Sequence, residues 1–260
     1  AMHARGISER DAWTAVVESG DATSTFALAR VDSAEPVEVA NAARAATPFL
    51  PASTFEPVHA LVALDAGAID TMDTVIPWDG VTRDVEAWNQ DQTLRAAVRD
   101  SVVWVFQMLA PMIGADAMGA GVTRAGYGNE TIGGDISSFW LDGELRTSAI
   151  DQLEFFEQLA LGTLPFDREQ QAQVQASLPR LDGPDSRITY KTGAATSAGE
   201  DRVAWLAGIV DTPEGQWVVA YNSGFVADGD TFRAPTAQER LDVVVDLLVV
   251  AEVISESPTS

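Results

Sequence analysis

Ser53, Glu56 and Lys191 are the residues whose types and spacing best fit nucleophilic chemistry. The segment 48–64, PFLPASTFEPVHALVAL, leads into an apolar helix that is predicted to begin at Ser53 and to close at Gly67. A helix N-terminus presents free amides and the positive end of the helix dipole, which favour negative charge at a serine oxygen. Glu56 follows one helical turn later on the same face. The pattern therefore predicts a serine nucleophile with a carboxylate beside it.

Lys191 is notable because it is the only lysine in a chain that has 15 arginines. An ammonium is a compact point charge, whereas a guanidinium is a broad planar fork. A single lysine among arginines therefore indicates a position that requires the smaller group. The surrounding sequence, RITYKTG, is typical of a β-strand.

The composition is that of an acidic globular protein. The 260 residues are 46% hydrophobic and carry 39 acidic against 16 basic side chains, which gives a formal charge of −23. This negative field argues against nucleic acid and anionic membrane surfaces as partners. The acids are dispersed along the chain, as in a solvated coat. No apolar run reaches the roughly 20 residues that cross a bilayer, so no membrane partner is expected.

Metal and thiol chemistry find little support in the sequence. The chain has no cysteine, and its only histidines are His3 and His59. Structural zinc sites take four ligands, mostly Cys and His, so no metal site is predicted. His59 falls on the apolar helix that follows Ser53, and we expect it to be packed in the core rather than catalytic.

Periodicity predicts strands towards both ends of the chain and helices between them. Alternating residues in 24–41 indicate a β-hairpin around the turn DSAEP. A stripe of apolar residues at spacings of four runs through 91–113, and a further helix fits 148–162 with Ser148 as its cap. Strands are predicted for RITYKTG, DRVAWLAGIVD and QWVVAYNSG, followed by a final helix over 236–254.

This order of elements predicts an α+β fold. One antiparallel sheet, built from both chain ends and flanked by helices, would carry an inserted all-helical lobe. We expect a single domain over residues 1–260, with a sheet lobe of about 20–52 and 185–260 and a helical lobe of about 53–184. The cleft between the two lobes is the expected place for a site.

Four short motifs occur in a suggestive order: STFE (53–56), SVV (101–103), YGN (127–129) and KTG (191–193). With flanking segments such as PFLPASTF, DSVVWVFQ and WLAGIVD, they resemble the class D, or oxacillinase-type, serine β-lactamases of the penicillin-recognising superfamily. The resemblance extends over nearly the whole chain. It implies the β-lactamase/transpeptidase-like fold, a small-molecule β-lactam as partner, a periplasmic or extracytoplasmic location, and a monomer or homodimer.

The resemblance also implies a role for each matched position. Ser53 would be acylated by the lactam, with the backbone amides of Ser53 and Ala194 as the oxyanion hole. Ser101 would relay a proton to the substrate nitrogen. The catalytic set is Ser53, Glu56, Ser101 and Lys191, and the substrate-binding set is Tyr127, Asn129, Trp140, Thr192, Gly193, Ala194 and Arg233.

Lys191, Thr192 and Arg233 would hold the carboxylate that penicillins and cephalosporins carry. Other residues of the substrate-binding set have competing structural interpretations. Tyr127 and Asn129 would serve equally as turn residues, and Trp140 is also typical of a core aromatic.

Glu56 departs from the family pattern Ser-x-x-Lys, in which the lysine is expected to be carbamylated by carbon dioxide and to act as the general base. Carbamylation is impossible at a glutamate, so no cofactor is expected. Glu56 matches the charge of a carbamate, but its side chain is about three bonds shorter, and a base must approach the proton directly or through a water. Burial would raise the pKa of Glu56, whereas Lys191 would lower it. Pro57 is a second departure.

Three interpretations stay open at this point. The chain is a β-lactamase that hydrolyses slowly, with Glu56 and a water, or Lys191 through Ser101, as base. Alternatively it is a non-hydrolytic penicillin-binding or sensor-like protein, or a class D enzyme in which Glu56 was introduced deliberately to inactivate it. A descendant that binds an unrelated ligand is a fourth alternative. The intact motifs favour β-lactam acylation at Ser53, with turnover left open.

Overall fold

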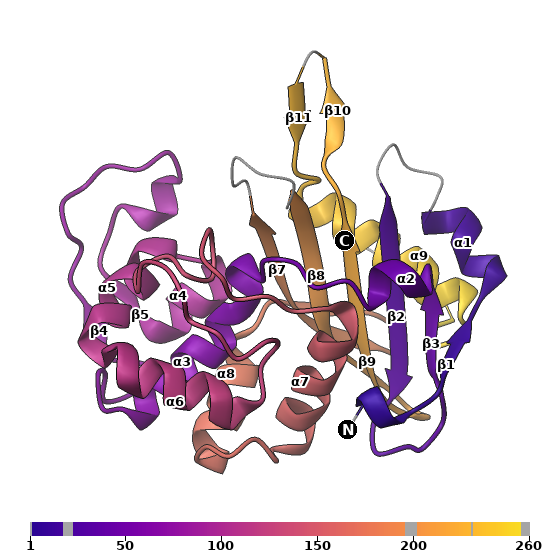
Figure 1. Cartoon of the computed structure of the whole chain (residues 1–260), viewed down its shortest axis with the longest axis horizontal. Coiled ribbons are helices and arrows are strands. Elements are labelled where there is room, and N and C mark those ends of the chain that lie inside the picture. Colours follow the sequence, from indigo (N-terminus) through magenta and orange to yellow (C-terminus); the bar gives the residue numbers. More distant parts are fainter. Residues whose placement is uncertain (1, 18–22, 196–201, 230, 256–260) are drawn as a thin grey trace.

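The computed structural model describes residues 2–17, 23–195, 202–229 and 231–255, and its centre is a seven-stranded sheet. Strands from the two ends of the chain lie side by side in it, because the first hairpin pairs with the last (Figure 1). The order is β1-β3-β2-β9-β8-β7-β6. These strands are β1 (Ile7–Glu9), β2 (Ser24–Arg30), β3 (Val37–Ala40), β6 (Arg180–Asp182), β7 (Arg187–Ala195), β8 (Val203–Thr212) and β9 (Gly215–Ser223).

Every neighbouring pair in this sheet is antiparallel except β1 with β3. The predicted α+β fold with a sheet built from both chain ends is confirmed. The sheet also extends beyond the predicted boundaries, because β1 and β6 add an edge strand on each side. Both edge strands have only three residues, too short for a periodicity of two to identify them. Asp201, at the start of one predicted strand, lies outside the described residues.

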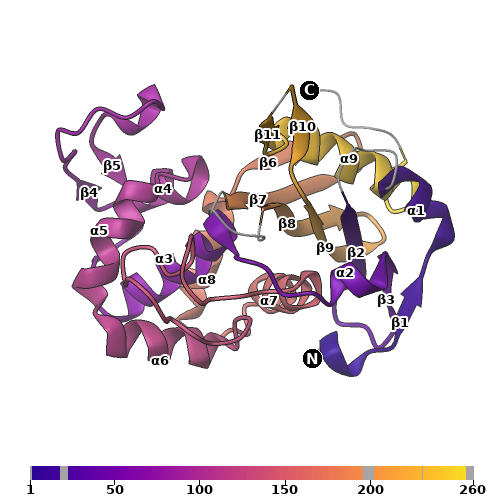
Figure 2. The same cartoon turned by 45° about the horizontal axis from the view of Figure 1, so that its top comes forward.

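Helices cover both faces of the sheet, and the alternation along β2 shows why. Phe26 and Leu28 pack with Trp13 of α1 (Asp11–Val17) and with α9 (Ala237–Val250). Ala27 and Ala29 belong to the other core, which α7 (Ala149–Leu161) covers (Figure 2). Successive side chains of a strand point to opposite faces, so a strand covered on both sides is buried almost continuously. α7 begins with the predicted cap, because Ser148 and Asp151 form a capping box.

The inserted segment between β3 and β6 forms a second body of helices beside the sheet (Figure 1). It also contains a short ladder of β4 (Val75–Ile76) and β5 (Gln92–Thr93), so it is not all-helical as predicted. Its main helices pack around the buried α3. They are α3 (Glu56–Asp65), α4 (Leu94–Asp100), α5 (Val103–Ile113), α6 (Ala115–Ala125) and α8 (Arg168–Ser177). Of the short turns, η3 (Glu86–Trp88) precedes β5, α2 (Ala42–Ala45) contacts β2, and η1 (Met2–Ala4), at the start of the described residues, contacts α7.

The single helix predicted over 91–113 is wrong, because the chain breaks at Ser101. That residue adopts a left-handed conformation with φ of 51°, which ends α4, and α5 begins again at Val103. The apolar stripe continues across the break because Val98, Val102 and Phe106 are all buried in one core. The spacing of apolar residues therefore predicted correctly which side chains are buried, but not that the helical backbone is interrupted.

α5 and α6 meet at a bend of 107°. Taken together they are long and apolar enough for a membrane span, but among the described residues no single helix is.

Arg240 fastens α9 to the strand that carries Lys191. Its guanidinium is buried and donates hydrogen bonds to the carbonyl oxygens of Gly193 at 2.5 Å and Trp205 at 2.8 Å. Burial lowers the pKa of Arg240 to about 10, still well above neutral pH, so the side chain is charged. The result is a cationic clamp across β7 and β8 at the level of the KTG motif.

Arg240→Met is expected to lower the free energy of unfolding by about 2–4 kcal/mol, because it leaves two buried carbonyls without their charged donor. Urea denaturation followed by circular dichroism measures this loss. Arg187→Met is the matched control on the exposed end of β7, where the solvent-screened ion pair with Asp182 should contribute little to stability. Equal losses in the two variants would show that Arg240 is no clamp.

Candidate active site

Ser53 lies in a 3-10 turn, η2 (Ala52–Phe55), that leads directly into α3. The predicted helix start is therefore confirmed in place, although its first turn is tighter than an α-helix. Ala52 has a φ of 49°, unusual for a residue with a side chain, and its amide donates to the carbonyl of Trp140 at 3.0 Å. Trp205 donates from its indole nitrogen to the carbonyl of Leu50 at 2.8 Å. These bonds fix the segment just before Ser53, and Ser53 itself is only 9% exposed.

Gly193 allows β7 to approach the Ser53 turn at backbone distance. A Cβ atom built on Gly193 would lie 2.9 Å from the amide nitrogen of Ser53 and 3.0 Å from both the carbonyl oxygen of Pro51 and the amide of Thr54. These are backbone atoms and cannot swing aside. A glycine is required here for lack of space, since its own backbone dihedrals are those of an ordinary strand. The KTG motif is thereby held directly against the nucleophile turn.

Lys191 and Glu56 form a buried ion pair behind Ser53. Lys191 Nζ lies 2.9 Å from Glu56 Oε2, and the two side chains are 1% and 0% exposed. The same ammonium donates to Ser101 Oγ and, at 3.2 Å, to the carbonyl oxygen of Thr192. Three segments remote in sequence, the Ser53 turn, the Ser101 break and β7, thus converge on one charged group. The structure brings together all four residues predicted to be catalytic.

Ser101 reaches this cluster because of the backbone break described above. A left-handed residue at the end of α4 turns the chain sharply, and Val102 closes the turn by donating to the carbonyl oxygen of Ala97 at 3.0 Å. Sparsely populated dihedrals at non-glycine residues cost about 1–3 kcal/mol and persist where the surroundings impose them. Both Ser101 and Ala52 adopt such dihedrals. Ser101 contacts Lys191 of the ion pair, and Ala52 directly precedes Ser53.

Burial and charge act in opposite directions on the carboxyl of Glu56. Loss of solvent is the larger effect and raises its pKa, while the Lys191 ammonium and the nearby hydroxyls of Ser53 and Ser101 lower it. Glu56 therefore ionises at a higher pH than an ordinary glutamate. Above that pH its charge is balanced by Lys191, and the pair presents no net charge to the core.

Trp140 is fully buried in the aromatic group behind Glu56 and packs against Phe55 and Phe139. These contacts agree with the core interpretation of Trp140, and a contact between Trp140 and a substrate stays a prediction. Its indole nitrogen has no hydrogen-bond partner in the described part of the chain.

Tyr127 is also buried, at 1% exposure, and its hydroxyl accepts a hydrogen bond from Gln152 at 2.9 Å. Gln152 donates in turn to the hydroxyl of Thr54 at 2.8 Å, next to Ser53. Burial raises the pKa of Tyr127, so it stays neutral. Its contacts are those of a core residue that supports the Ser53 turn. Direct contact with a substrate stays a prediction.

Asn129 is exposed and holds a loop together. Its side chain donates to the carbonyl oxygen of Glu144 and accepts from the amide of Arg146, both at 2.9 Å. Gly128 before it has a φ of 56°, and a Cβ there would collide with the carbonyl oxygen of Arg146. The turn interpretation of YGN thus has a structural basis, and a contact between Asn129 and a ligand stays a prediction.

Thr192 and Ala194 alternate along β7 with the buried Lys191 and Gly193, and both are partly exposed. Arg233 lies on β11 (Thr231–Arg233), which forms a projecting hairpin with β10 (Val226–Asp228) (Figure 1). Its guanidinium makes two 2.7 Å hydrogen bonds to the carboxylate of Glu239. This partner raises the pKa of Arg233. An incoming carboxylate would share Arg233 with Glu239.

Sequence reasoning missed several residues that position this site. Arg240, Gln152 and Trp205 act through hydrogen bonds to backbone or neighbouring side chains across the fold. Buried polar residues inside otherwise apolar elements were the only available clue. Among the described residues no group of three or more His, Cys, Asp or Glu side chains is arranged to hold a metal ion.

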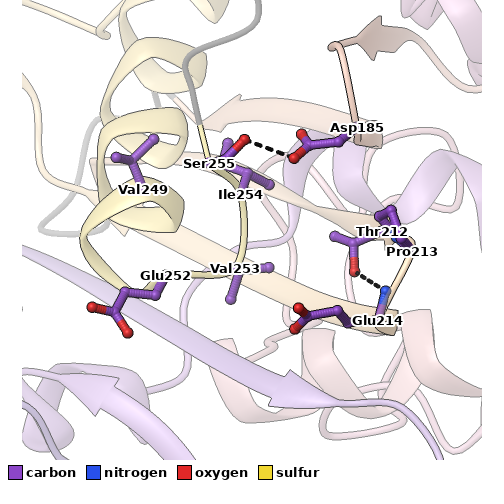
Figure 3. Close-up of a pocket in the computed structure, with 9 residues that line it drawn as sticks. All are labelled: Asp185, Thr212, Pro213, Glu214, Val249, Glu252, Val253, Ile254 and Ser255. Atoms are coloured by element: carbon purple, nitrogen blue, oxygen red, sulfur yellow. Dashed lines mark hydrogen bonds between the residues drawn. The ribbon is translucent and has the colours of Figure 1, made fainter.

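A separate hollow lies where β8 turns into β9, at the opposite end of β8 from Trp205 (Figure 3). Asp185, Glu214 and Glu252 contribute carboxylates to its lining, and Ser255 donates to Asp185 at 2.6 Å. It contains none of the residues around Ser53.

Comparison with known proteins agrees with this geometry. The family model described as the penicillin-binding protein transpeptidase domain matches residues 13–240. Among curated proteins, β-lactamase OXA-48 of Klebsiella pneumoniae is 39% identical over 203 residues, covering 77% of this chain and 76% of the relative. β-Lactamase OXA-5 of Pseudomonas aeruginosa is 37% identical over 218 residues, with 83% and 81% covered. The chain belongs to the superfamily of penicillin-binding transpeptidases and class D β-lactamases.

Solved structures of class D β-lactamases have the same fold. The enzyme FUS-1 (OXA-85) of Fusobacterium nucleatum subsp. polymorphum aligns with a TM-score of 0.86 at 27% identity, covering 95% of this chain and all of the other. The class D enzyme YbXI from Nostoc aligns with a TM-score of 0.84 at 30% identity, with 93% and 99% covered. The class D resemblance read from the motifs is therefore confirmed at the level of family and fold.

Gly193→Ala is expected to lower the free energy of unfolding by about 1–3 kcal/mol, because the added methyl group meets the backbone of the Ser53 turn. Chemical denaturation measures the change. Gly119→Ala in α6 is the matched control, since its Cβ would meet only Ile132 at 3.5 Å and alanine favours a helix. A Gly193 variant as stable as the control would mean that β7 has room to move away.

Proposed function

We propose that this protein binds β-lactams and is acylated by them at Ser53, and that its acyl-enzyme is long-lived. The observation that carries the proposal is the buried Lys191–Glu56 pair at 2.9 Å, which lies behind a serine at a helix start. The superfamily supplies the substrate class, since the relatives are named β-lactamases and the matching family model describes a penicillin-binding domain.

Ser53 Oγ attacks the lactam carbonyl carbon, so that the Ser–carbonyl bond forms as the carbon–nitrogen bond of the ring breaks. The Ser53 proton is taken up by ionised Glu56, and the departing ring nitrogen takes a proton from Ser101. The Lys191 ammonium returns a proton to Ser101 and recovers one from protonated Glu56, so that Ser101 and the ion pair end in their starting protonation states. Lys191 touches both Glu56 and Ser101, so its ammonium links proton acceptor and donor. The amides of Ser53 and Ala194 serve as the oxyanion hole.

Thr192, Ala194 and Arg233 are the proposed contacts to the substrate. Thr192 and Ala194 are partly exposed on β7 beside Ser53, and Gly193 between them holds that strand against the nucleophile turn. Arg233 is positioned on the adjoining hairpin, where Glu239 keeps its guanidinium oriented. A bidentate guanidinium is well suited to a carboxylate such as the one on a penicillin.

Release of the acyl group requires a water that reaches a base. Glu56 is 0% exposed and one of its oxygens is engaged by Lys191, so it offers little to a water arriving from the solvent side. Its side chain carries no carbamate that would extend its reach, which is why we propose slow deacylation. The hydrolase alternative is favoured by the relatives at 34–39% identity, which are named β-lactamases.

Intact-protein mass spectrometry after mixing with a penicillin tests the proposal. A mass gain of one drug molecule is expected, persisting long after free drug is removed, and Ser53→Ala should abolish it. Lasting labelling of Ser53→Ala would contradict the assignment of the nucleophile. Drug consumed without a lasting adduct would establish turnover and favour the hydrolase. Drug that is neither bound nor consumed would contradict both the long-lived acyl-enzyme and the hydrolase.

On acidification, the rate of acylation is expected to begin to fall at a higher pH than it would if the base were an ordinary glutamate. Only the carboxylate form of Glu56 accepts the proton, and burial raises its pKa, so the active form is lost earlier on acidification. Stopped-flow rates of adduct formation across the acid range provide the measurement.

Glu56→Gln should slow acylation at least tenfold and remove this acid limb, because an amide does not titrate. Glu86→Gln, on an exposed turn, is the control and should keep both rate and limb. An unchanged limb in Glu56→Gln would assign the base to another group.

A further inference from the structure

His59 is a buried titratable residue that the proposed reaction does not use. It lies on α3 one helical turn after Glu56, with no exposed surface. Its ring is enclosed by Phe55, Phe106 and Trp140, whose ring centres lie 5.7, 5.2 and 5.1 Å away. Burial lowers the pKa of His59 to about 3, so the ring is neutral and carries one N–H donor and one acceptor nitrogen.

The packed interpretation of His59 is confirmed by these contacts, but it leaves polar atoms unexplained. Neither ring nitrogen of His59 has a hydrogen-bond partner in the described part of the chain, and neither has the indole nitrogen of Trp140. Among the described residues, the Lys191 ammonium at 2.9 Å and the hydroxyls of Ser53 and Ser101 are the polar groups that stabilise the Glu56 carboxylate, and a carboxylate has acceptor sites for more donors than these. Unsatisfied buried groups cost about 1–3 kcal/mol each, and proteins usually satisfy such clusters with ordered water.

These three side chains form one connected cluster. Glu56 and His59 are spaced i,i+3 on a helix, a separation that places neighbouring side chains in contact range. His59 and Trp140 meet edge to face, at 81° between their planes. Glu56 belongs to the site at Ser53, and His59 and Trp140 are buried against Phe55, the residue that precedes Glu56. We propose that a buried water molecule bridges Glu56, His59 and Trp140, and that His59 thereby positions the general base.

The hydrogen-bond donors and acceptors of this cluster fit a water molecule better than an inorganic anion or a metal cation. Trp140 offers a donor, an ionised Glu56 requires donors, and neutral His59 offers one of each. A water molecule supplies two donors and two acceptors, so it can bond one polar atom of each of the three side chains at once. An inorganic anion would meet the Glu56 carboxylate with like charge, and a metal cation would face the N–H of Trp140.

This water gives Glu56 a hydrogen bond in addition to its contact with Lys191. A donor to a carboxylate favours its charged form, so the water opposes the effect of burial. The titratable and charged groups around the cluster are Glu56 itself, Lys191 on β7 and Tyr127, which packs on Phe55. Phe106 of α5 and Phe139 contribute only apolar surface. The effect of this water on acylation rests on the proposed function, whereas the presence of the water does not.

The test uses the unreacted protein and follows the Glu56 carboxyl carbon by NMR as a function of pH. His59→Phe keeps an aromatic ring but removes both nitrogens, and Trp140→Phe removes the indole donor. Each should raise the apparent pKa of Glu56 by about one pH unit, and the double variant should add little, because either change disrupts the same water. His59→Gln, which retains a donor and an acceptor, should restore most of the difference.

Phe106→Leu is the packing control, since it contacts His59 but carries no polar atom, and it should leave the Glu56 pKa unchanged. A high-resolution crystal structure of the unliganded wild type should show one solvent peak within hydrogen-bond distance of all three residues. Direct bonds among these side chains without solvent, or a Glu56 pKa unaffected by His59→Phe and Trp140→Phe, would overturn the inference. Because no drug is present, this outcome is independent of whether Ser53 is acylated.

Discussion

The buried pair of Lys191 and Glu56 is the interaction on which the rest of the site depends. Two charges removed from water are stable only when each compensates the other, and losing one partner of such a pair typically costs about 3–5 kcal/mol. The pair therefore constrains three segments at once: the helix that carries Glu56, the strand that carries Lys191, and the Ser101 break whose hydroxyl the ammonium also contacts. Because these segments also carry Ser53, the same interaction positions the nucleophile.

Close packing of backbones makes that pair possible. Gly193 brings β7 within backbone distance of the Ser53 turn, and Arg240 holds the same strand from behind through the carbonyl oxygen of Gly193. On the other side, buried aromatic rings exclude solvent from Glu56. Exclusion of water strengthens the attraction between the charges and raises the cost of leaving either alone. A rigid site that is closed to bulk solvent is suited to forming a covalent bond, and it gives water from the solvent little access to the base.

Members of the superfamily with similar folds include named β-lactamases and penicillin-binding domains, so fold alone does not decide between turnover and trapping. That choice depends on a few atoms around the base. Here they are the carboxylate of Glu56, the ammonium that engages it, and the nitrogens of His59 and Trp140, which lack a partner among the described residues. Each of these groups changes the free energy of one protonation state, and together they determine when Glu56 can accept a proton.

The sequence by itself determined the family, the α+β class, the terminal hairpin and helix, and the four catalytic candidates, because motif order and local periodicity are properties of the chain. Only the tertiary structure decided how those candidates meet. The apolar stripe through Val98, Val102 and Phe106 predicted one helix, and the left-handed Ser101 divides it, since burial and backbone geometry are separate constraints. The sign of the Glu56 pKa shift likewise follows from desolvation outweighing Lys191, a balance between groups 135 positions apart in the sequence that no local pattern encodes.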